Sequence, residues 1–92
     1  MNEPASSWRV ILLHEPAKVL RRLPRDLLRR FRHAIRELAV NPRPSGCVKL
    51  AGYENLYRVR VGDWRIIYAL EEERLVVVVI EIAPRGEAYR GL

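Results

Sequence analysis

The chain has 92 residues, a formal net charge of +6 and a sequence pI near 10.2. This length allows a single domain, which we place at residues 1–92, and the chain contains no run of about 18 apolar residues that would cross a bilayer. Its positive charge is mostly arginine, which favours nucleic acid or an acidic protein as a partner, although a solvated surface can also simply be basic.

The cysteine, histidine and N-terminal patterns argue against secretion and against a metal. The single cysteine, Cys47, cannot form an internal disulfide, which fits a reducing compartment. Residues 8–13 are too short for the apolar core of a signal peptide, and they lack a small-residue cleavage site. His14 and His33 have no cysteine or carboxylate cluster at metal-ligand spacing. We therefore expect a cytoplasmic protein with no metal and no small-molecule cofactor.

The first half of the chain predicts one strand and two helices. We expect residues 1–7 to fray, and residues 8–13 to form a strand apolar enough for the interior of a sheet. Residues 14–23 form a short helix that Pro24 ends. Residues 25–40 form an amphipathic helix, because apolar side chains recur at offsets of three, four, seven and eight. Its polar face is either solvated or a contact for phosphates or an acidic helix, and it carries Arg25, Arg29, Arg32 and Arg36.

A hairpin follows a proline-rich connector. Residues 56–61 and 64–70 predict two strands joined by a Gly62-Asp63 turn, which suits type II′. With that turn Arg60 lies opposite Arg65, and alternation places Arg58 on the same face. The other face is apolar and carries Tyr57, Val59, Val61, Trp64, Ile66, Tyr68 and Leu70. Because like charges opposite one another destabilise a strand pair, these arginines predict an anion site.

The last strand completes the predicted fold. Residues 75–80 are a β-branched run, which is typical of a buried central strand. The order is then an N-terminal strand, a helical hairpin and a three-stranded antiparallel meander. We predict an α+β fold with the helices on one face of the sheet.

This order and several segments resemble the RelE/ParE toxins of bacterial type II toxin–antitoxin systems, over about residues 8–90. The segments are Leu38-Ala39-Val40-Asn41-Pro42, Lys49-Leu50, the hairpin from Tyr57 to Tyr68, and Arg85 with Ala88-Tyr89-Arg90. The resemblance implies a microbial-RNase-like (RelE-like) fold and a cognate antitoxin as partner. It also implies one of two activities: RelE-type members cut mRNA in the ribosomal decoding site, and ParE-type members poison DNA gyrase.

The resemblance also implies site residues. In the ribonuclease members the active surface is formed at the positions that are here Arg58, Arg60, Arg65, Arg85 and Tyr89. We add Lys49 and Arg90 as phosphate contacts. The chain departs from the family at Ala83-Pro84-Arg85, where many relatives carry Gly-His-Arg. A mechanism that uses that histidine is not open to this chain, because proline has no titratable group.

The chemistry that these residues suit is metal-independent RNA cleavage, in which a 2′-hydroxyl attacks the adjacent phosphorus. The arginines would stabilise the negative charge of the transition state. Arginine is a poor base, so the candidates for proton transfer are Glu81 and Tyr89. Glu81 reaches the arginines in only one of two strand registers, and its structural alternative is an ion pair with Arg65 or Arg85. The structural alternative for Tyr89 is a core aromatic.

Three functions remain open from the sequence. The first is an endoribonuclease toxin that cuts mRNA at the ribosome. The second is a gyrase inhibitor with no chemistry of its own. The third is a catalytically degenerate RNA-binding relative, which Pro84 motivates.

Overall fold

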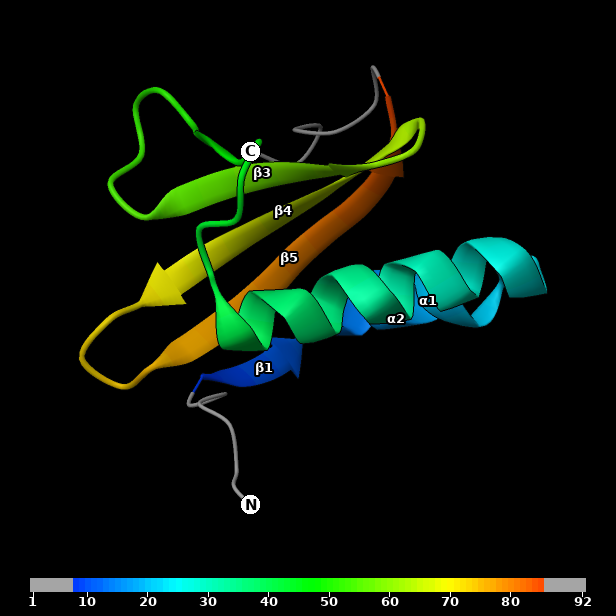
Figure 1. The fold of residues 1–92 in the computed structure, drawn as a ribbon, viewed down its shortest axis with the longest axis horizontal. Coiled ribbons are helices and arrows are strands. Elements are labelled where there is room, and N and C mark those ends of the chain that lie inside the picture. Colours follow the sequence, from blue (N-terminus) through cyan, green and yellow to red (C-terminus); the bar gives the residue numbers. More distant parts are fainter. Residues whose placement is uncertain (1–7, 86–92) are drawn as a thin grey trace.

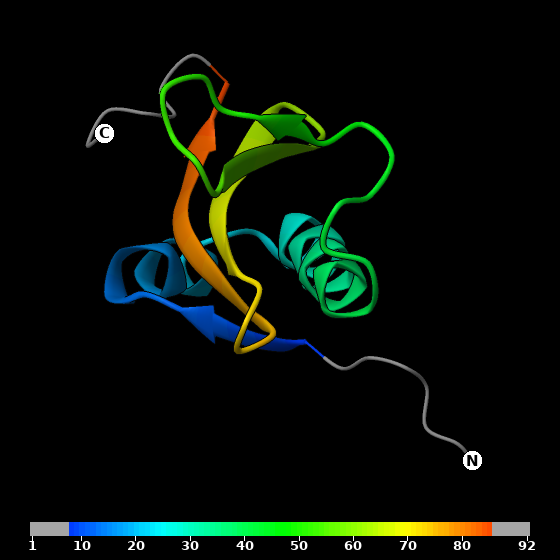
Figure 2. The ribbon, with the colours of Figure 1, turned by 90° about the vertical axis from the view of Figure 1, so that its left-hand side faces the viewer.

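The computed structural model describes residues 8–85, which form two helices and a five-stranded sheet (Figure 1, Figure 2). The sheet order is β1-β5-β4-β3-β2, with β1 parallel to β5 and the other neighbours antiparallel. The elements are β1 (Arg9–Leu12), α1 (His14–Arg21), α2 (Arg25–Val40), β2 (Val48–Lys49), β3 (Leu56–Val61), β4 (Trp64–Glu71) and β5 (Val76–Pro84).

This architecture confirms the predicted α+β class, the helical hairpin and the meander of β3, β4 and β5. One feature of the sheet is additional. The strand β2 has only two residues, too few to show an alternating pattern in the sequence. The expectation that residues 8–13 lie in the interior of the sheet is wrong, because β1 forms an edge of the described sheet, with Arg9 and Leu12 exposed, and the interior position beside it is taken by β5.

The helices bury their apolar stripes against one face of the sheet. Helix α1 packs on β5, and α2 contacts both β1 and β3 as it crosses the sheet (Figure 1). Phe31 and Leu38 of α2 are fully buried, and Phe31 meets the Trp64 ring edge-on at 5.8 Å between centroids. Pro24 caps the start of α2 and extended backbone at Asn41 ends it, as predicted. Neither helix is long and apolar enough to span a membrane.

The hairpin has the predicted register. Arg60 pairs with Arg65 and Val61 with Trp64, across the turn formed by Gly62 and Asp63. Gly62 has a φ of +62°, and Asp63 is not among the residues with positive φ, which is the pattern of a type II′ turn. A two-residue turn fixes the register of the two strands, and the register determines on which face of the sheet each side chain lies.

A β-bulge divides the pairing between β4 and β5 into two segments with different registers. Tyr68 pairs with Val79, but its neighbour Ile67 pairs with Glu81, so Ile80 is an extra residue in β5. Without the bulge, Glu81 would share a face with the buried Ile66 and point toward the helices. The bulge instead places Glu81 on the side of the sheet away from the helices.

The connector after α2 is attached to the sheet through two tyrosines. The Tyr68 hydroxyl donates a hydrogen bond to the Pro42 carbonyl oxygen at 2.7 Å, and burial raises the pKa of Tyr68 above its ordinary value. The Tyr57 ring stacks on Tyr68 with centroids 5.9 Å apart. Arg43 lies over the Tyr57 ring, donates to its hydroxyl at 3.2 Å and pairs with Glu72, which raises the Arg43 pKa. These contacts hold the connector against β3 and β4.

Candidate nucleic-acid interface

The sheet surface away from the helices carries three arginines and is called here the arginine face: Arg58 and Arg60 on β3, and Arg65 on β4. Arg60 lies directly across from Arg65, as predicted, and Arg58 lies across from Ile67. Arg58 and Arg65 are half-buried, whereas Arg60 is exposed. The chain therefore keeps like charges opposite one another in the middle of its hairpin.

Arg65 has an unusual environment for a guanidinium. Its Nε atom is buried, and no acceptor within residues 8–85 lies in hydrogen-bonding distance. Neither Arg65 nor Arg60 takes part in an ion pair within the described residues. A buried donor with no partner costs about 1–3 kcal/mol. An oxyanion bound between Arg60 and Arg65 would separate the two opposed charges.

Arg85 is brought to the same end of the sheet by a backbone contact. Its amide donates to the Asp63 carbonyl oxygen at 2.7 Å, which ties the end of β5 to the β3–β4 turn. The exposed Arg85 is therefore next to the turn that places Arg60 opposite Arg65. Pro84 pairs with Trp64 and faces the helices, so it lies on the other side of the sheet from the arginines.

Glu81 lies on the arginine face because of the β-bulge. It is half-buried and, through Ile67, belongs to the same row of the sheet as Arg58. Both Glu81 and Arg58 have interaction partners, so neither is a free charge. The predicted ion pair of Glu81 with Arg65 or Arg85 is absent among residues 8–85, where neither arginine is ion-paired. Glu81 is the carboxylate that the fold places among the arginines.

Of the other predicted contacts, the structure places one away from this surface and does not describe two. Lys49 pairs with Tyr57, whose side chain lies on the helix side, so the register places Lys49 on the opposite face from Arg58. Tyr89 and Arg90 lie outside the described residues. Within residues 8–85 no group of three or more histidine, cysteine, aspartate or glutamate side chains is positioned to hold a metal ion.

A small apolar cluster under the arginine face was not predicted from the sequence. It consists of Leu50, Leu56, Ile67 and Ala83, of which Ile67 is fully buried. The hairpin alternation already placed Leu56 and Ile67 on this face, but only the segment after β2 brings Leu50 over them. The cluster removes water from one side of the arginines and so strengthens their interaction with a bound anion.

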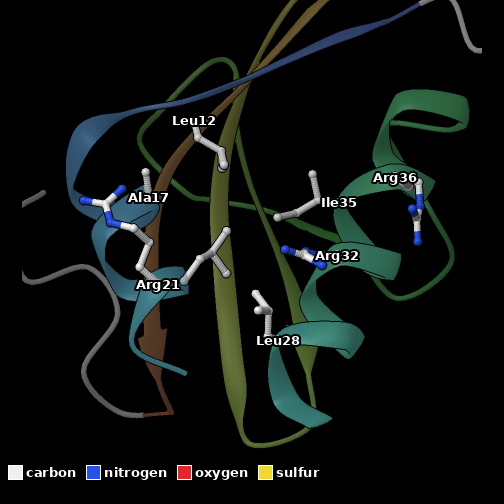
Figure 3. Close-up of a pocket in the computed structure, with 8 residues that line it drawn as sticks. Leu12, Ala17, Arg21, Leu28, Arg32, Ile35 and Arg36 are labelled. Carbon is white, nitrogen blue, oxygen red and sulfur yellow. The ribbon is translucent and has the colours of Figure 1, made fainter. Parts of the chain in front are cut away.

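A second surface feature is a groove between α1 and α2, of about 480 Å³. Figure 3 shows Leu12, Leu28 and Ile35 pointing into the space between the helices. Arginines from both helices border this apolar floor: Arg21, Arg32 and Arg36. We call this feature the helix groove. Its chemistry suits an amphipathic segment with apolar and acidic side chains.

The sequence and the fold are those of a toxin family. The family model that describes the ParE toxin of type II toxin–antitoxin systems (parDE) matches residues 11–89, and the chain belongs to this family. It is therefore a RelE/ParE-like member of the toxins of toxin–antitoxin modules.

Two of the similar proteins are archaeal and one is from E. coli. The chain is 32% identical over 77 residues to the toxin RelE1 of Methanocaldococcus jannaschii, which covers 80% of this chain and 86% of that protein. It is similar to a chain in the crystal structure of the RelE–RelB complex from Pyrococcus horikoshii, with 33% identity and a TM-score of 0.79 over 89% of this chain and 99% of that one. The isolated E. coli RelE toxin shares the fold, with a TM-score of 0.76 at 20% identity over 89% and 88% of the two chains.

Proposed function

We propose that this protein is the toxin of a type II toxin–antitoxin module and a metal-independent endoribonuclease that cuts mRNA at the ribosome in the cytoplasm. The observation that carries the proposal is the pairing of Arg60 with Arg65, where a buried guanidinium nitrogen lacks an acceptor. Arg85 is tied to the same turn. Guanidinium groups bind phosphate oxygens through two parallel hydrogen bonds, so this arrangement suits a phosphodiester.

The proposed reaction is an internal transfer at phosphorus. The 2′-oxygen loses its proton to the Glu81 carboxylate and attacks the adjacent phosphorus, forming the O2′–P bond. The O5′–P bond breaks, and the leaving oxygen takes up a proton, for which Tyr89 is the proposed donor. The products are a 2′,3′-cyclic phosphate and a 5′-hydroxyl end. Arg65, with Arg60 and Arg85, stabilises the additional negative charge that develops on the phosphate oxygens.

The test is transcript mapping after induction of the toxin. Primer extension should show new 5′ ends in translated mRNAs, and cells should stop growing as translation halts. Arg65→Ala and Arg85→Ala should each lower cleavage by about a hundred-fold or more, which is the usual effect of removing a group that stabilises transition-state charge. Arg74→Ala is the matched control, because Arg74 lies in the turn before β5 and pairs with Glu71 at 2.9 Å.

Full cleavage by both the Arg65 and Arg85 variants would contradict the proposed site. If the Glu81→Gln variant still cleaves RNA with an unchanged pH–rate profile, Glu81 is not the general base. That result would leave the proposed role of the arginines unaffected. RNA binding without any new 5′ ends would favour the catalytically degenerate relative, which Pro84 motivates.

The second candidate is inhibition of DNA gyrase, and the family model favours it, because the matched family is that of the ParE toxins. The two candidates differ in phenotype. A gyrase inhibitor would cause filamentation and a DNA-damage response with transcripts intact, and purified protein would block supercoiling by gyrase. Identity of 32–33% to RelE relatives favours the ribonuclease.

We propose a cognate antitoxin as the protein partner, because the Pyrococcus relative comes from a complex of RelE with RelB. We propose that the antitoxin binds in the helix groove. An acidic amphipathic helix would place apolar side chains against Leu28 and Ile35 and carboxylates against the bordering arginines. Co-expression with the protein encoded by the neighbouring gene should restore growth and yield a stable complex. Ile35→Glu should weaken that complex, and Val40→Glu, at an exposed site outside the groove, should not.

A further inference from the structure

A basic cavity of about 600 Å³ lies between α2 and the β3–β4 turn. It shares Arg36 with the helix groove, and no acidic residue of the described part of the chain lines it. Five of its lining side chains are arginine or histidine: Arg29, Arg30, His33, Arg36 and Arg60. We call this feature the α2 cleft. Of its residues, Arg60 belongs to the arginine face, and Arg36 also borders the helix groove.

The contact between Arg30 and Gly62 shows that the cleft depends on the hairpin turn. A Cβ atom at Gly62 would lie 2.9 Å from Nη2 of Arg30 and 3.2 Å from Nη1. Gly62 adopts the positive φ of the turn, and the flexible end of the Arg30 side chain lies against it. The turn that places Arg60 opposite Arg65 is thus also next to Arg30.

The charges in the cleft are not neutralised by neighbouring carboxylates. Within residues 8–85, Arg30, Arg36 and Arg60 take part in no ion pair. Arg29 pairs with Asp26 only at 3.9 Å, between two largely exposed side chains, so solvent screens that contact. Solvated arginines on a helix usually point apart into water. Here they line a hollow together with Arg60 from the sheet, which favours an anionic ligand over simple solvation.

We propose that the α2 cleft is a second phosphate site, which holds the backbone of the same RNA several nucleotides away from the bond that is cut. This inference rests on the proposed ribonuclease function. Arg60 connects the two sites, because it lies across from Arg65 on the arginine face and is also one of the residues that line the cleft. The strand β2 pairs with Tyr57 and Arg58, so no strand within residues 8–85 pairs with this side of β3 beside Arg60. A single strand can cross this edge, since it follows a charged surface without a fixed shape.

RNA is favoured over an acidic protein segment for two reasons. The cations in the cleft are guanidinium groups, which match phosphate oxygens in a planar, bidentate way. The cleft also continues from the arginine face through Arg60, whereas the helix groove lies between the two helices and has an apolar floor. The two features therefore have different occupants: nucleic acid in the α2 cleft and the antitoxin in the helix groove.

The test measures binding of RNA that cannot be cut, so that it is independent of catalysis. Fluorescence anisotropy would compare 2′-O-methyl RNAs of about five and about fifteen nucleotides, a range that spans typical single-strand site sizes. The double variant Arg30→Gln/Arg36→Gln should weaken binding of the longer RNA by about ten-fold. Its plot of log affinity against log salt should be shallower by about 1.4, or about 0.7 for each lost phosphate contact. Binding of the shorter RNA should not change.

Arg22→Gln/Arg25→Gln is the charge-matched control, because both arginines are exposed and line neither cavity. Equal affinity of this control and the Arg30→Gln/Arg36→Gln variant for the longer RNA would overturn the cleft proposal while leaving the proposed ribonuclease intact. Loss of binding for both RNA lengths in Arg65→Ala, with the cleft residues unchanged, would instead locate all binding at the arginine face and also overturn it. If the double variant loses affinity for labelled poly-glutamate but not for RNA, the cleft binds an acidic protein.

If the wild-type protein binds neither RNA, both the cleft proposal and the RNA-binding part of the proposed function fail. Thermal denaturation of every variant shows whether it is folded. Arg60→Gln provides an independent check, because it should weaken binding of both RNA lengths, as expected of a residue shared by the two sites.

Discussion

Replacing Arg65 by methionine should stabilise the protein and abolish its proposed activity. Methionine keeps the length and apolar stem of the side chain but removes the buried Nε, which has no acceptor within residues 8–85. That unpaired donor costs about 1–3 kcal/mol, and the opposed charge of Arg60 adds about 0.2–1 kcal/mol. Because Arg65 is only half-buried, the lower part of this range applies, and we expect a gain of about 1–2 kcal/mol.

The assay is thermal and urea denaturation of the wild-type and variant proteins. For a domain of this size each kcal/mol corresponds to about 4–8 °C, so Tm should rise by about 5–10 °C. The matched control is Arg60→Met, which removes the same like-charge contact at an exposed position and should change the free energy of unfolding by less than about 0.5 kcal/mol. A lower Tm for Arg65→Met would show that Arg65 stabilises the fold, and the argument for a phosphate site at this residue would fail.

Three further predictions concern the core and the connector. Tyr68→Phe removes the donor to the Pro42 carbonyl and should cost about 1–2 kcal/mol, seen as a lower urea midpoint at unchanged m. Because burial raises the pKa of Tyr68, the unfolded chain loses this proton first as the pH rises above about 10. The free energy of unfolding of the wild-type protein should therefore fall above that pH, and the fall should be smaller for Tyr68→Phe. Equal slopes of unfolding free energy against pH in the two proteins would contradict this prediction. Phe31→Ala should cost about 3–5 kcal/mol through a cavity beside Trp64, whereas Val40→Ala, at an exposed site, should be nearly neutral.

The hairpin and the long helix could be predicted from the sequence because their determinants are local. The Gly62-Asp63 turn specifies which residues of β3 and β4 face one another, so the opposition of Arg60 and Arg65 followed without any tertiary information. Pro24 and Asn41 similarly delimit α2, whose apolar period identified its buried side. The central part of the arginine face is therefore a property of neighbouring residues in the chain.

Long-range contacts decided the remaining parts of the site. The bulge at Ile80 places Glu81 on the arginine face, and alternation alone allows either face, since one extra residue reverses every side chain beyond it. The pairing of Lys49 with Tyr57 places that lysine on the other side of the sheet.

The α2 cleft also exists only in the folded molecule, because it joins Arg30 of a helix to Gly62 of a turn. The amino-acid sequence by itself thus determined the register of the arginine hairpin and the buried face of α2. The tertiary structure decided that Glu81 lies among the arginines and that a second basic surface, the α2 cleft, forms beside the hairpin turn. The physical reason is that periodicity specifies a face within one element, whereas the pairing between distant elements depends on bulges and packing that no local pattern contains.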